Sequence, residues 1–354
     1  MTSKERVLAA FSHAEPDRVP VNYLSNAGTD RRLKNHFGLA HDDDLGIREK
    51  LNVDILNFAP EYKGPELHAP VEGRQISEYG AHRRWVEHGS GGYWDFCDFP
   101  LKNADDETFM NWPMPNPDDY DFSKLIAVCR RNPDKFLAVG HPGIADIMNH
   151  TGMIAGTEDI LIHLAEENEG CLGFIDRMIN VQLGWLERLF EMEKGMFDML
   201  WMGEDLGTQI APIISLDMYR RLIRPRHQKF IDLAKAYGLK VMIHSCGSSS
   251  WFFNDFIEMG IDVVDTLQPE AVNMSPDYLK KTFGDKLAFH GCISTAGPVA
   301  EGTVDDVIAD CRKTLDIMMP GGGYCFAPTH CIQDNSPTEN VLAMYETAAK
   351  YGVY

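Results

Sequence analysis

Short apolar runs alternate with longer amphipathic segments through the last two thirds of the chain. Each run is short enough for a single strand, and the segments between them carry polar residues on one face, which is typical of helices. The pattern predicts strands at residues 136–140, 198–202, 239–243, 263–267, 287–290 and 323–327, and helices at 157–193, 215–237, 251–259, 276–282, 304–318 and 338–350.

The apolar runs are nearly continuous, as expected of parallel strands that are buried on both faces. Strands that alternate with helices indicate βαβ units, and in a chain of 354 residues these units favour a closed barrel. We therefore predict an α/β fold, a (β/α)8 TIM barrel that forms one domain over residues 1–354, with an N-terminal helical segment. An open doubly wound sheet is the alternative.

Residues 73–103 interrupt this pattern with glycines and aromatic side chains. Such a composition is typical of antiparallel strands joined by tight turns, so we predict a β-hairpin insertion over one end of the barrel. Its aromatic side chains either pack among themselves or line a pocket for an aromatic ligand. They are Trp85, Tyr93, Trp94 and Phe96.

Polar residues follow several of the predicted strands directly. Because the carboxyl ends of barrel strands meet at one rim, where barrel enzymes carry their chemistry, these residues are candidates for one site. The candidates are Glu204 and Asp205, His244 and Cys246, Gln268 and Glu270, His290 and Cys292, and His330 and Cys331.

His244 and Cys246 form the sharpest local signal. Residues two apart on an extended segment point to the same side, and an imidazole nitrogen with a thiolate sulfur favours zinc. The alternative is a core histidine beside a small buried cysteine. Three further donors could complete a metal site, namely Cys325, which lies within the last strand, and His330 and Cys331 in the loop that follows it.

Glu204 and Asp205 form a carboxylate pair in a glycine-flanked loop. The pair is suited to proton transfer or to orienting a substrate hydroxyl, and equally to capping the N-terminus of a helix. Gln268 is a third candidate for the catalytic site. It either supports His244 from behind or caps a helix.

Composition narrows the classes of partner. A formal net charge of −20 repels phosphate backbones and anionic lipids, so we expect no nucleic acid and no membrane surface as partner. The N-terminus lacks the apolar core of a signal peptide, and no apolar run approaches the about 20 residues of a membrane span. We expect a cytoplasmic protein whose eight cysteines are reduced.

Several motifs together resemble the uroporphyrinogen decarboxylase-like superfamily, and within it the cobalamin-dependent methyltransferase branch. They are SKERVLAAFSHAEPDRVPV at residues 3–21, MIHSCGS at 242–248, GIDVVDTLQP at 260–269, FGDKLAFHG at 283–291 and GGGYCFAPTHCIQDNSPTENVLAMYE at 321–346. The resemblance spans almost the whole chain, and the region 73–103 is its least secure part.

The resemblance implies a (β/α)8 barrel with zinc on a His-x-Cys motif and on a cysteine in an APGC sequence near the last strand. Carried over, the ligands are His244, Cys246 and His330, because APTH stands here in place of APGC. An imidazole in place of a thiolate leaves the metal a stronger Lewis acid. We therefore hypothesise a methyl ether or a similar methylated small molecule as the substrate. Cobalamin would arrive on a corrinoid partner protein, because the chain has no Asp-x-His-x-x-Gly motif.

Two other functions are kept as alternatives. The first is decarboxylation of a porphyrinogen, although Arg31 and Arg32 do not form the RQAGR motif of true uroporphyrinogen decarboxylases. The second is a non-catalytic barrel that binds a corrinoid or a porphyrin. A second copy of the chain, in a homodimer, is a further candidate partner. The methyl donor or acceptor and the direction of transfer are left open.

Overall fold

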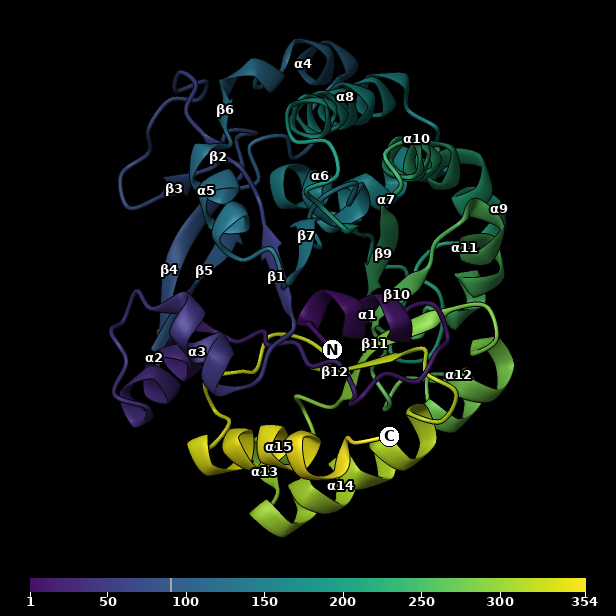
Figure 1. Cartoon of the computed structure of the whole chain (residues 1–354). Helices are drawn as coiled ribbons and strands as arrows, with labels where there is room; N and C mark the ends of the chain where they lie inside the picture. Colours follow the sequence, from purple (N-terminus) through teal and green to yellow (C-terminus); the bar gives the residue numbers. More distant parts are fainter. Residues whose placement is uncertain (90) are drawn as a thin grey trace.

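The computed structural model describes residues 1–89 and 91–354. Its centre is a sheet of parallel strands that follow one another around a ring (Figure 1). In spatial order these are β1 (Ile55–Phe58), β7 (Phe136–Gly140), β8 (Met199–Gly203), β9 (Lys240–Ser245), β10 (Val263–Thr266), β11 (Ala288–Ile293) and β12 (Tyr324–Pro328).

Residues 20–22 close this ring between β12 and β1. Val21 forms a parallel bridge with Phe326, and the Asn22 N–H donates to the Phe326 carbonyl at 3.0 Å. On the other side, the Asp54 N–H donates to the Val21 carbonyl at 2.8 Å. The predicted (β/α)8 barrel is therefore confirmed, with this short segment in the place of the first strand.

Helices cover the outside of the ring (Figure 1). They are α5 (Ser123–Arg131), α6 (Met148–Ala155), α7 (Thr157–Ala165), α8 (Glu169–Met192), α9 (Leu216–Met218), α10 (Arg224–Ala236), α11 (Phe253–Met259), α12 (Pro276–Phe283), α13 (Pro298–Glu301), α14 (Val304–Met318) and α15 (Thr338–Tyr351). No helix of the described ranges is long and apolar enough to cross a membrane.

Two of the predicted helices are divided in the structure. The helix expected at 157–193 is α7 and α8, because Glu167 takes a left-handed backbone (φ 53°) and Asn168 caps α8 by accepting from the Cys171 N–H. The helix expected at 215–237 is α9 and α10, joined by a π-helical turn at Tyr219–Ile223.

The predicted insertion is a three-stranded antiparallel sheet of β3 (Gln75–Ile76), β4 (His82–His88) and β5 (Gly91–Cys97). Residue 90, between β4 and β5, lies outside the described residues. The rest of the N-terminal part consists of α2 (Ala27–His36), α3 (Asp44–Lys50), α4 (Asp106–Asn111) and the small pair β2 (Glu61–Tyr62) and β6 (Tyr120–Asp121). Below, we call β4 and β5 the insertion hairpin.

The N-terminal helix α1 (Ser3–Ala10) lies against the amino-terminal end of the barrel. A capping box between Thr2 and Glu5 fixes its start, and Val7 and Phe11 pack into the apolar interior of the barrel. This interior includes Ile55, Phe136, Ala138, Met199, Trp201, Met242, Val263, Ala288 and Cys325. Because α1 and these apolar side chains fill the amino-terminal end, we expect a polar site at the opposite, carboxyl-terminal rim.

We expect Asp54→Ala to lower the free energy of unfolding by about 3–5 kcal/mol, because it leaves two arginines without their shared, fully buried carboxylate. Asp54 accepts from Arg6 and Arg18, each at 2.8 Å, and also from the Val21 N–H. Urea unfolding measures the change. The control is Asp17→Ala, which removes a largely exposed partner of Arg6 and should cost about 0–1 kcal/mol. Equal losses would contradict this account.

Candidate metal centre

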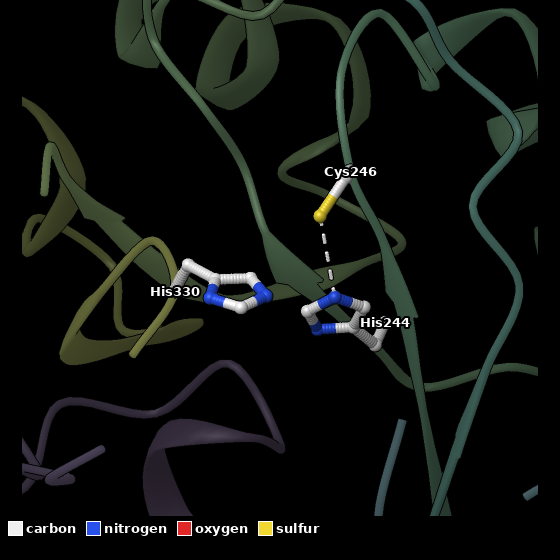
Figure 2. Close-up of side chains that lie close together, drawn as sticks. All are labelled: His244, Cys246 and His330. Carbon is white, nitrogen blue, oxygen red and sulfur yellow. Dashed lines mark hydrogen bonds between the residues drawn. The ribbon is translucent and has the colours of Figure 1, made fainter. Parts of the chain in front are cut away.

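Three side chains converge at the carboxyl-terminal rim of the barrel (Figure 2). His244 lies near the end of β9, Cys246 directly follows this strand, and His330 stands in the loop after β12. Their ligand atoms lie within 4.8 Å of one another. The Cys246 Sγ is 3.3 Å from the His244 Nε2, and the two imidazole rings meet edge to face with centroids 5.7 Å apart. The three candidates from the sequence therefore lie together.

The turn after β9 is held so that Cys246 stands beside His244. The Cys246 N–H donates to Asp205 at 2.8 Å, and the Gly247 N–H donates to the Gln268 side chain at 2.6 Å. Gly247 has a left-handed backbone, and a side chain there would meet the carbonyl oxygen of Gly207 at 2.3 Å. Only glycine allows this close approach, so the sequence after Cys246 fixes the direction of the thiol.

Asp265, which was not among the candidates from the sequence, orients His244. It lies opposite His244 in the register between β10 and β9, it is 1% exposed, and its carboxylate is 2.6 Å from the His244 Nδ1. Because Nδ1–H donates to this carboxylate, Nε2 faces Cys246 and His330. A carboxylate behind a histidine ligand is the usual arrangement in zinc sites.

The same carboxylate holds a second histidine. Its other oxygen is 2.6 Å from the His290 Nδ1, and the His290 Nε2 is 2.9 Å from the Asn22 side-chain nitrogen. The Asn22 oxygen accepts from the Tyr23 N–H at 2.8 Å, so the amide nitrogen faces His290 and donates to it. His290 therefore carries its proton on Nδ1, which leaves a continuous buried network from Asn22 to His244.

The backbone at the end of β10 is strained. Thr266 and Leu267 have φ of 88° and 56°, a region that β-branched residues rarely adopt. The Thr266 hydroxyl lies 2.9 Å from the His244 Nδ1. Strain of this kind persists where surrounding contacts enforce it, often at functional sites, and here it places a hydroxyl against the edge of the His244 ring.

The surroundings of His244 favour a positive charge on its ring. Burial alone would lower the pKa of His244, but Asp265 and Cys246 outweigh it and hold this pKa well above its ordinary value. Burial raises the pKa of Cys246, and the neighbouring His244 offsets part of this increase. Burial and His244 lower the pKa of His330. A metal ion can take the place of the proton on the His244 Nε2, with the Asp265 carboxylate still in contact behind it.

The two neighbouring carboxylates, Glu204 and Asp205, face different environments. Both oxygens of Glu204 accept from backbone N–H groups at the start of α6, from Ile147 at 2.8 Å and Met148 at 2.9 Å, and burial raises the pKa of Glu204 to about 8. Asp205 instead turns to the three converging side chains, where one oxygen lies 3.8 Å from the His244 Nε2. Glu204 thus caps a helix, and its role in catalysis stays a prediction.

The other sequence candidates take different places. Cys325 is fully buried in the apolar interior of the barrel, so it does not supply the third ligand. Cys331 is half-buried, and its thiol is not among the three converging ligand atoms found in the described ranges. Gln268 holds the Gly247 N–H and not His244, so the support expected from Gln268 comes from Asp265. A direct catalytic role of Gln268 stays a prediction.

Comparison with known proteins gives one family match and one structural likeness. The family described as uroporphyrinogen decarboxylase (URO-D) matches residues 151–351 of the chain, which carry β8 to β12 and all three converging side chains. The structure is similar to that of a methyltransferase from Methanosarcina mazei, with a TM-score of 0.68 and 16% sequence identity over 99% of each chain; at this identity the likeness shows a shared fold. Among curated proteins none matches in sequence.

Proposed function

Since this chain belongs to the uroporphyrinogen decarboxylase (URO-D) family, we propose that it is a zinc-dependent methyltransferase that moves a methyl group between a methylated small molecule and a corrinoid protein. The observation that carries the proposal is the convergence of His244, Cys246 and His330 at the catalytic rim of the barrel. The similar methyltransferase from Methanosarcina mazei supports the reaction class.

The donor set fits zinc. Two imidazoles and one thiolate are ligands that zinc prefers, and three protein ligands leave the fourth position of a tetrahedral catalytic site for a substrate. With Zn–N at about 2.0–2.1 Å and Zn–S at about 2.3 Å, two tetrahedral ligands stand roughly 3.6 Å apart. The His244 and Cys246 atoms, at 3.3 Å, are close to this spacing and need to separate by only about 0.3 Å to bind one ion. When bound, zinc supplies a Lewis acid at the mouth of the barrel.

The residues around the centre prepare this chemistry. Asp265 fixes the ring of His244, and Asp205 fixes the turn that carries Cys246. With a methyl ether as donor, the carbon–oxygen bond breaks, the methyl group passes to the reduced corrinoid of the partner, and the electron pair stays on the oxygen, which then takes one proton. Asp205, which reaches the centre and remains partly exposed, is placed to deliver that proton from solvent.

The decarboxylase alternative finds less support. Arg32 is occupied, since it donates to the Thr29 hydroxyl and the Ser336 carbonyl, and Arg31 lies exposed on α2. Arg32 is thus already engaged by groups of the chain itself. Release of carbon dioxide from uroporphyrinogen by the metal-free protein would favour this alternative over methyl transfer.

Removal of the metal tests the proposal. We expect one zinc per chain in the purified protein, and loss of methyl transfer from aryl methyl ethers to reduced cobalamin after chelation, because the substrate then lacks its Lewis acid. Added zinc should restore the rate. Cys331→Ala, which removes the neighbouring thiol outside the converging group, should keep both zinc and activity. Full activity in the chelated protein would refute the proposal.

A further inference from the structure

A cavity of about 210 Å³ lies at the same rim, between the insertion and the ends of β1 and β7. Tyr79 and Arg83 line it from the insertion, His141 from the end of β7, and His150 and Trp185 from α6 and α8. None of the three converging side chains of the metal centre lines it. Its lining is rich in aromatic rings, which favour flat apolar ligands.

Arg83 is the arginine of this lining, and it forms no ion pair with any residue that the structure describes. Its Nε is buried and makes no hydrogen bond with any residue in the ranges 1–89 and 91–354. Its guanidinium lies over the ring of Phe96, 4.8 Å from the centroid, and this contact provides no hydrogen-bond acceptor in the ring plane of the guanidinium. A buried charged donor without an acceptor costs free energy, and a ligand that supplies the acceptor would recover it.

The number of carboxylates in the chain does not explain why Arg83 forms no ion pair with a described residue. The chain carries a net charge of −20, and other half-buried arginines are paired, such as Arg226 with Asp176 at 2.9 Å. The carboxylate in the cavity lining, Glu78, lies 3.5 Å from the Tyr120 hydroxyl and forms no ion pair with Arg83 within the described chain. Burial lowers the pKa of both histidines of the lining, His141 and His150, that of His150 to about 4, so Arg83 is the lasting positive charge among the described lining residues.

The cavity and the metal centre are linked by one helix. α6 carries His150 in the cavity wall, and its Asn149 donates to Asp205 at 3.0 Å. Asp205 in turn accepts from the N–H of Cys246. At its other end the insertion hairpin reaches the loop after β12, where His88 lies 3.7 Å from Asp334. The hairpin thus extends from the cavity toward the loop that carries His330, along the mouth of the barrel.

We propose that this cavity binds a small aromatic carboxylate, with Arg83 pairing with the carboxylate group and the rings of Tyr79 and Trp185 packing on the aromatic part. An apolar cavity of about 150 Å³ accepts benzene, so 210 Å³ suits one ring with small substituents. The planar guanidinium matches a carboxylate in two parallel hydrogen bonds. That this acid is the methyl donor rests on the proposed function.

Binding of benzoate and of its neutral analogue benzamide to the purified full chain tests the cavity by calorimetry. Because the charge-assisted pair forms only with the acid, benzoate should bind roughly 10- to 100-fold more tightly than benzamide. Arg83→Gln should abolish this preference, and Arg83→Lys should restore part of it. Arg84→Gln is the matched control, since Arg84 is exposed on the opposite face of β4 and should leave the preference intact.

Chelation separates this proposal from the metal centre. The preference for benzoate should survive removal of zinc, because Arg83 and not the metal recognises the acid. Equal affinity for the two ligands, equal effects of the Arg83 and Arg84 variants, or a preference that disappears with the zinc would each overturn the cavity proposal. A failure of methyl transfer would instead overturn the proposed function and leave the cavity result standing.

Discussion

His244→Ala is expected to abolish stable zinc binding and to lower the rate of methyl transfer by roughly 10³-fold or more. The side chain supplies one of three ligand atoms that lie within 4.8 Å of one another, and two remaining ligands do not make a catalytic zinc site. The Lewis acid contributes several kcal/mol to the transition state, which corresponds to about that factor in rate. Zinc content and single-turnover methyl transfer measure the two effects.

Loss of His244 also leaves Asp265 without one of its two buried partners, so the variant could lose activity through lost stability alone. Cys246→Ala separates the two causes, because it removes a ligand while Asp265 keeps both histidines. We expect the same loss of zinc and activity, with an unfolding midpoint of the metal-free protein close to that of the wild type. Retained zinc in both variants would place the metal elsewhere.

The barrel could be predicted because its strands obey the simplest rule of burial. All residues of β7, β8, β10, β11 and β12 are buried, which produces the continuous apolar runs that parallel strands require. The limits of the helices were harder to predict. A left-handed residue at Glu167 and a π-helical turn at Tyr219–Ile223 divide segments whose amphipathic pattern continues across the break.

The candidate metal centre could be predicted from the residues that stand at or just past the ends of strands. His244, Cys246 and His330 stand at strand ends, which meet at one rim in any barrel. Asp265 was not predicted to belong to the site, because a single acidic residue within an apolar run does not change the prediction of a buried strand. Its role depends on register, which sets it opposite both His244 and His290. The motif GIDVVDTLQP contained the signal, since a carboxylate in a fully buried strand requires a charged or hydrogen-bonding partner.

The environment of Arg83 is a second feature that could not be predicted from the sequence. The sequence placed aromatic side chains on the insertion, and the structure adds that Arg83 and Phe96 pair across its two strands. In a hairpin, alternate residues point to opposite faces, so Arg83 and Arg84 have opposite environments although they are chemically the same. Which face meets the barrel depends on how the insertion packs on the rest of the chain, for example through Tyr79 against His150 of α6, and no local pattern in the sequence determines that.

Asp265→Asn is expected to weaken zinc affinity by roughly 10- to 100-fold, the usual cost of losing the carboxylate behind a histidine ligand. The amide keeps the shape of the side chain but offers one acceptor oxygen, whereas His244 and His290 each donate Nδ1–H to Asp265 at 2.6 Å. One of the two imidazoles then faces an N–H group and must turn or change its tautomer. If His244 does so, its Nε2 is no longer directed at Cys246.

Competition with a chromophoric chelator measures the affinity, and unfolding of the metal-free variant measures stability. Asp262→Asn is the control, since this partly exposed residue near the start of β10 pairs with Lys235 and lies away from both histidines. It should leave zinc affinity unchanged. If the role of Asp265 is only structural, Asp265→Asn lowers the unfolding midpoint and leaves the zinc affinity of the folded fraction as in the wild type. If Asp265 positions His244, Asp265→Asn lowers the zinc affinity of the folded fraction as well. It also slows methyl transfer at saturating zinc, because His244 is held less firmly.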